Sequence, residues 1–134
     1  MKILLVIDQF DHGNNGTTIS AQRFARTLQQ HGNEVRVIST GEEEEGKYAV
    51  REWRIPIFDG LIKSQGMMFA RPNKTTLRTA MEWADVVHFL MPFALSIEGE
   101  RVARELHKPC TASFHVQPEN ITSSIGMGLS LIHI

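Results

Sequence analysis

The sequence has few of the residues that mark secreted, membrane-spanning or nucleic-acid-binding proteins. Cys110 is the only cysteine among 134 residues, so no internal disulfide can form, which is typical of a reducing compartment. The first apolar run covers residues 3–7 and ends at Asp8, which is too short for a signal peptide or a membrane span. Because 14 basic and 15 acidic residues nearly cancel, nucleic acid is not expected as a partner. We therefore expect a cytoplasmic protein.

The sequence does contain alternating short apolar strands and amphipathic helices. An apolar run or alternating apolar residues predict strands at residues 3–7, 34–39, 48–58, 85–90 and 110–116. Apolar residues at helical spacing predict helices at residues 18–31, 77–84 and 99–106, with Thr17 or Thr18 capping the first, Gly32 ending it and Asn73 capping the second. The alternation predicts one α/β domain: a Rossmann-like, open, mostly parallel sheet with helices on both faces and strand order 3-2-1-4-5.

A loop with two glycines separates the first strand from the first helix. Gly13, Gly16 and Thr17 stand where α/β folds present free backbone N–H groups and a helix dipole to an anionic ligand. A phosphate-bearing ligand is one interpretation, and a plain tight turn is the other. The glycine spacing matches neither the dinucleotide fingerprint nor the P-loop.

A polar run follows the last predicted strand, where open α/β sheets bind ligands. His115, Gln117, Glu119 and Asn120 could bind sugar hydroxyls or relay a proton, or they could form an ordinary polar loop. His88 lies inside an apolar strand, where a buried, hydrogen-bonded imidazole is the commoner role. No metal centre is expected, since there is neither a cysteine pair nor a zinc-type histidine spacing.

A stretch rich in apolar residues, at residues 57–70, also contains basic side chains. It could form an amphipathic surface that contacts an apolar acceptor or a membrane interface. Core packing combined with a loop explains the same pattern. Peripheral membrane contact is therefore left open by the sequence.

Taken together, these segments resemble the N-terminal, acceptor-side domain of GT-B glycosyltransferases of family 4. The resemblance rests on the opening strand at residues 2–6, the Gly13/Gly16 loop, residues 28–38 with Gly32-Asn-Glu-Val, the strand Asp85-Val-Val-His88, and Lys108-Pro109 followed by residues 111–115. These segments stand in the family's order and cover the chain to about Gly128.

The resemblance implies retaining transfer of a sugar from a nucleotide-diphosphate sugar to a glycan or lipid acceptor, with no metal or other cofactor. Gly13, Gly16 and Thr17 would face the donor diphosphate, and His115 would be the catalytic residue near the transferred sugar. The candidate acceptor- or sugar-binding residues are His88, Gln117, Glu119 and Asn120.

The family's nucleotide-binding C-terminal domain does not follow in this sequence. We therefore expect residues 1–128 to be a partial N-terminal domain of a truncated enzyme that is inactive alone. Residues 129–134 resemble translated sequencing-adapter read-through and are expected to be a non-native tail. Two alternatives remain at this point: a Rossmann-type nucleotide-sugar epimerase or oxidoreductase, and a non-enzymatic receiver-like signalling domain.

Overall fold

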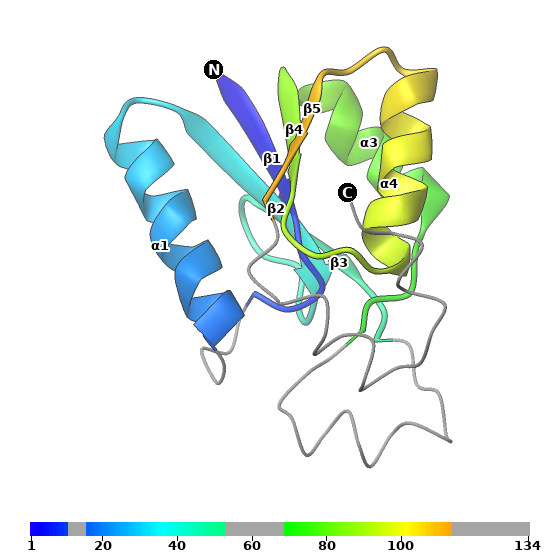
Figure 1. Ribbon diagram of the computed structural model, residues 1–134, viewed down its shortest axis with the longest axis horizontal. Coiled ribbons are helices and arrows are strands. Elements are labelled where there is room, and N and C mark those ends of the chain that lie inside the picture. The colour runs from blue at the N-terminus through cyan, green and yellow to red at the C-terminus, as the bar shows by residue number, and fades with distance from the viewer. Residues whose placement is uncertain (11–15, 53–68, 114–134) are drawn as a thin grey trace.

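The fold is a five-stranded parallel sheet with helices on both faces (Figure 1). The computed structural model describes residues 1–10, 16–52 and 69–113. Its strands are β1 (Lys2–Val6), β2 (Glu34–Thr40), β3 (Lys47–Val50), β4 (Val86–Phe89) and β5 (Cys110–Ala112), in the order β3-β2-β1-β4-β5. The described helices are α1 (Gly16–Gln30) on one face, and α3 (Lys74–Trp83) and α4 (Ala94–Glu105) on the other. The predicted fold class and strand order are confirmed.

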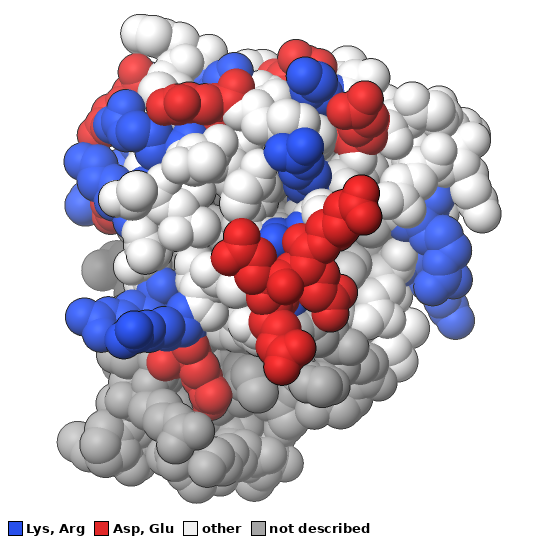
Figure 2. All heavy atoms as spheres, turned by 180° about the vertical axis from the view of Figure 1, so that it is seen from behind, with Lys and Arg blue, Asp and Glu red and all other residues white. Residues whose placement is uncertain are grey.

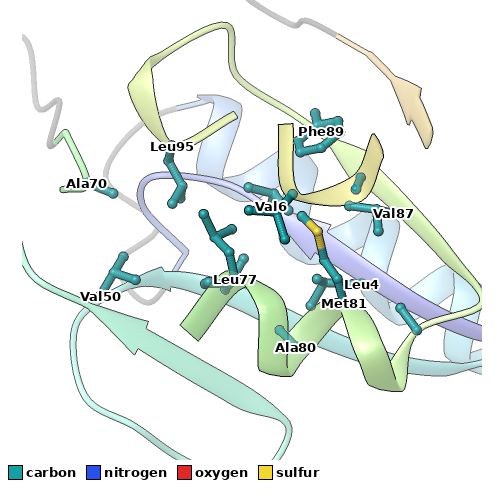
Figure 3. Close-up of a cluster of buried hydrophobic side chains, with 14 residues drawn as sticks. Leu4, Val6, Val50, Ala70, Leu77, Ala80, Met81, Val87, Phe89 and Leu95 are labelled. Carbon is teal, nitrogen blue, oxygen red and sulfur yellow. The ribbon is translucent and has the colours of Figure 1, made fainter. Parts of the chain in front are cut away.

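Strand β1 lies in the middle of the sheet and sends alternate side chains to opposite faces. Leu4 and Val6 pack toward α3 and α4, whereas Ile3 and Leu5 pack toward α1. Because both faces are covered, the strand is apolar at every position from residue 3 to residue 7, as is typical of parallel sheets. Figure 3 shows the larger core, where Leu77, Met81 and Leu95 from the helices meet Val6, Val87 and Phe89 from the sheet.

Two of the predicted helix ends are confirmed. Gly32 has φ +89° just after α1, and its N–H donates to the Gln29 carbonyl at 3.0 Å, so a glycine stands where the backbone must turn left-handed. The Asn73 side chain accepts from the Thr76 N–H at the start of α3. The start of α1 differs from the prediction, since this helix begins at Gly16 and includes both threonines that were candidate caps.

The connection between β2 and β3 is short for two parallel strands. Parallel neighbours usually need about a dozen connecting residues, but here only residues 41–46 intervene. Gly41 and Gly46 make this possible with φ values of +106° and +80°, which favour glycine. The Gly46 carbonyl then accepts from the Val37 N–H at 2.9 Å. Strand β3 is the edge of the described sheet, as predicted, and its predicted continuation beyond residue 52 lies outside the described residues.

We expect Gly99→Ala to destabilise the protein even though alanine is the better helix former. A Cβ at Gly99 would lie 2.8 Å from Phe89 Cε1 and 3.4 Å from Met81 Cε, both in the packed core. Overpacking of this kind costs about 1–3 kcal/mol, more than the roughly 1 kcal/mol gained in helix propensity. Thermal unfolding should show a lower Tm.

Ser96→Ala is the matched control for this variant. Ser96 is also buried on α4, and its hydroxyl has no hydrogen-bond partner among the described residues. Its removal should leave Tm unchanged or raise it. A Gly99→Ala protein as stable as the wild type would contradict the packing of α4 on β4.

Candidate functional site

The first candidate loop opens at the carboxyl edge of the sheet. Gly16 is the first residue of α1 and is exposed, and Thr17 follows it in the first helical turn. In Figure 1 the start of α1 lies at the same end of the sheet as the last residues of β1. This is the edge at which open α/β sheets bind ligands. Gly13 lies outside the described residues.

Asp8 connects three segments of the chain at this edge. Its Oδ2 accepts from the Ala70 N–H at 2.7 Å, across 62 residues of sequence. Its main-chain carbonyl accepts from both the N–H and the hydroxyl of Thr40, at 3.1 and 2.7 Å. The end of β1 is therefore tied both to the end of β2 and to the segment that leads into α3.

The Asp8 carboxyl group is 2% exposed, and burial raises its pKa from 3.8 to about 7. The hydrogen bond from Ala70 opposes this shift, because it favours the ionised form. Among the described residues, Oδ1 has no hydrogen-bond partner. Asp8 is thus a buried carboxyl group that can change charge near neutral pH.

Sequence reasoning does not assign Asp8 to the site. The pattern shows it only as the polar end of a strand, because its partner Ala70 lies far along the chain in a segment without clear periodicity. An acidic residue directly after an apolar parallel strand is the one signal that the sequence offers.

His88 lies half-buried on β4, on the sheet face covered by α1. Its Nδ1 is 2.6 Å from the Thr111 hydroxyl, and its Nε2 is 2.8 Å from the Ser113 hydroxyl. The centroid of the Phe24 ring, on α1, lies 5.1 Å from the centroid of the His88 ring. These contacts hold β4 to β5. They agree with the structural role expected for His88, that of a hydrogen-bonded imidazole. Its role in acceptor binding stays a prediction.

A cavity of about 590 Å³ adjoins His88, between α1 and the sheet at β4 and the residue after β5. It is lined by Ser20, Arg23, Phe24, Thr27, His88 and Ser113. Phe24, a large apolar side chain, is 37% exposed beside it. An aromatic ring beside hydroxyl groups is an arrangement that suits a sugar ring.

The other predicted site residues, His115, Gln117, Glu119 and Asn120, lie outside the described residues, as does most of the apolar stretch at residues 57–70. In the parts of the chain that the structure describes, no three His, Cys, Asp or Glu side chains are grouped as a metal would need. No helix there has the length and hydropathy required to cross a membrane.

The matching family decides between a glycosyltransferase and the two other classes of protein that the sequence left open. The family described as "Glycosyltransferase Family 4" matches residues 14–133. The chain belongs to glycosyltransferase family 4. The expected resemblance to the N-terminal part of a GT-B glycosyltransferase is thereby confirmed.

Two relatives show how far this similarity extends. The chain is 25% identical over 133 residues to the alpha-monoglucosyldiacylglycerol synthase of Streptococcus pneumoniae (strain ATCC BAA-255 / R6), covering 96% of this chain and 30% of that protein. The crystal structure of Acinetobacter baumannii MurG superposes with a TM-score of 0.55 at 18% identity, over 98% of this chain and 38% of MurG. The chain thus spans about a third of the length of each relative.

We expect the Asp8 carboxyl group to make stability fall as the pH rises from about 4 to 7. The folded protein keeps its proton in this window, whereas the unfolded chain has released it, because the pKa of this group is 3.8 when it is fully hydrated and about 7 in the fold. Asp8→Asn should flatten this part of the profile and raise Tm at pH 8 by on the order of 5 °C.

Thermal unfolding between pH 5 and pH 8 checks this prediction. Asp85→Asn is the control, since Asp85 is exposed and its Oδ2 accepts from the Lys2 N–H at 2.8 Å. The control should keep the pH dependence of the wild type. An Asp8→Asn protein with an unchanged profile would show that Asp8 is ionised throughout.

Proposed function

We propose that this chain is the acceptor-side domain of a retaining glycosyltransferase, which moves a sugar from a nucleotide-diphosphate sugar to a glycan or lipid acceptor. The observation that supports this most strongly is the family match across residues 14–133. The helix start at Gly16, which follows the central strand at the carboxyl edge, is a suitable place for the donor diphosphate.

The proposal gives each candidate residue a role. Gly13, Gly16 and Thr17 form the loop that faces the donor diphosphate. His115 polarises or positions the transferred sugar, a function that suits an imidazole. The residues that hold the sugar or the acceptor are His88, Gln117, Glu119 and Asn120. No metal or other cofactor takes part.

The nucleotide would be bound mainly by a second, C-terminal domain. The name of the S. pneumoniae relative refers to a glucosylated diacylglycerol. A lipid acceptor at the cytoplasmic face of a membrane is therefore one version of the proposal, and peripheral membrane contact would go with it.

We predict that the 134-residue chain alone transfers no sugar. Transition-state stabilisation of the departing diphosphate would have to come from the donor domain. The purified chain should be incubated with a panel of nucleotide sugars and with glycan and lipid acceptors, and products should be separated by mass spectrometry. Turnover above a heat-inactivated control would contradict the division of labour between two domains.

In a longer protein that carries the donor domain, we expect His115→Ala to lower kcat/KM by on the order of 10²-fold, the scale of a positioned acid–base or polarising group. Far-UV circular dichroism and Tm should barely change. His31→Ala is the control, since His31 is exposed just after α1, beyond the end of the helix opposite to Gly16. An active His115→Ala enzyme would leave His115 without a catalytic role.

A further inference from the structure

A second hollow opens at the carboxyl edge, beside the edge strand β3. Its volume is about 820 Å³. It lies between the ends of β2 and β3 and the start of α3. Its lining includes Gly41, Arg51, Glu52, Arg71, Asn73 and Lys74. Three of these side chains are cationic and one is anionic.

The backbone holds the two arginines next to each other. Glu52 and Ala70 form an antiparallel bridge, and the Arg71 N–H donates to the Arg51 carbonyl at 2.7 Å. Ala70, the residue before Arg71, donates its own N–H to the buried Asp8 carboxylate at 2.7 Å. The backbone of Arg71 is thus bonded directly to Arg51, and the residue before it is held by the Asp8 side chain.

The arginines at this hollow differ from the arginines of α3 and α4, which are paired with glutamates. Arg78, Arg101 and Arg104 each pair with a glutamate, at 2.6, 3.3 and 2.6 Å. Within the described residues, no carboxylate lies within the 4.0 Å ion-pair distance of Arg51 or Arg71. The two residues face each other across the backbone bridge and carry like charges, and an anion bound between their side chains would offset that charge.

The third cation comes from the start of α3. Lys74 is 57% exposed and lies 3.5 Å from Glu105, a contact of little energetic weight at such exposure. Its ammonium group can therefore turn toward the hollow at small cost. In Figure 2, Lys and Arg side chains gather along the left edge of the face, with an acidic side chain directly below the lower-left group, and acidic side chains dominate the middle.

We propose that this hollow binds a phosphate-type anion, with Arg51 and Arg71 as the principal ligands. Planar guanidinium groups bind phosphate oxygens in pairs, which suits two arginines held side by side. The inference rests on the proposed function in one respect: within glycosyl transfer, this anion is a group on the acceptor.

The topology separates this anion from the donor diphosphate. The donor loop follows the central strand β1, whereas Arg51 follows β3, two strands away in the sheet. Two strand spacings amount to roughly 10 Å. One diphosphate held at Gly16 would therefore not fill the hollow, and a second anionic group has its own place at the edge.

Binding by the chain itself tests the anion site without any transfer reaction. Backbone amide NMR shifts should be followed while inorganic phosphate or glycerol 3-phosphate is added at low salt. We expect saturable shifts at Arg51, Arg71 and Lys74, and a loss of affinity on the order of tenfold or more for Arg51→Gln with Arg71→Gln. Arg101→Gln, which removes a paired arginine on α4, should bind as the wild type does.

Several outcomes would overturn the inference. Equal weakening by Arg101→Gln would mean unspecific attraction, and absence of shifts at Arg51 and Arg71 would remove the site. Binding to phosphatidylglycerol vesicles but not to glycerol 3-phosphate would assign the arginines to a lipid surface instead of an acceptor group. If the double variant does not fold, Arg51→Lys with Arg71→Lys keeps both charges, and it should still lose several-fold in affinity because the paired contacts are lost.

The longer protein separates this inference from the proposed function. With an acceptor that has a phosphate, Arg51→Gln with Arg71→Gln should raise KM on the order of tenfold and leave kcat nearly unchanged, whereas a neutral acceptor should show no effect. If KM for the phosphate-bearing acceptor does not change in the double variant, the anion is not a group on the acceptor, and the proposed function stands. Phosphate binding without any sugar transfer would refute the proposed function while the anion site stands.

Discussion

The geometry of the carboxyl edge depends on one buried carboxyl group. Asp8 ends the central strand, accepts from the Ala70 N–H through its side chain, and binds Thr40 through its main-chain carbonyl. These bonds fix the ends of β1 and β2 and the approach to α3 relative to one another. Burial of this junction also raises the pKa of the carboxyl group to about 7. The residue that fixes the three segments therefore changes its charge near neutral pH.

Around this junction, successive strands deliver different chemistry to one edge of the sheet. β1 leads to the glycine-containing start of α1, Gly41 follows β2, and Arg51 follows β3. Parallel strands place all these ends at the same edge of the sheet. Residues far apart in the sequence therefore lie near one another there as a consequence of the topology alone. The apolar core beneath needs only the alternation of side chains in β1 and β4, which leaves the loops free to differ in chemistry.

The sheet order, the described helices and two of the helix ends could be predicted from the sequence because they depend on local patterns. Apolar runs, helical spacing, Gly32 and Asn73 each act within a few residues. The predicted start of α1 is two residues late, because Thr17 and Thr18 resemble caps and an exposed glycine gives no competing signal. The six-residue crossover between β2 and β3 is predictable only as a loop. The parallel pairing of β2 with β3 depends on positive φ values at Gly41 and Gly46. Glycine can adopt such values, but its presence in the sequence does not show that it does.

The candidate site was harder to predict, because its contacts join segments that share no pattern. Arg51 and Arg71 are ordinary surface residues in the sequence, and only the bridge between Glu52 and Ala70 makes them neighbours. That bridge is in turn held by Asp8, a residue that the sequence pattern shows only as the polar end of a strand. The buried acid thus holds the segment that places Arg71 opposite Arg51. The centre of the sheet is apolar and the charged side chains stand on the segments tied to it, so the chemistry of this edge can change without disturbing the core.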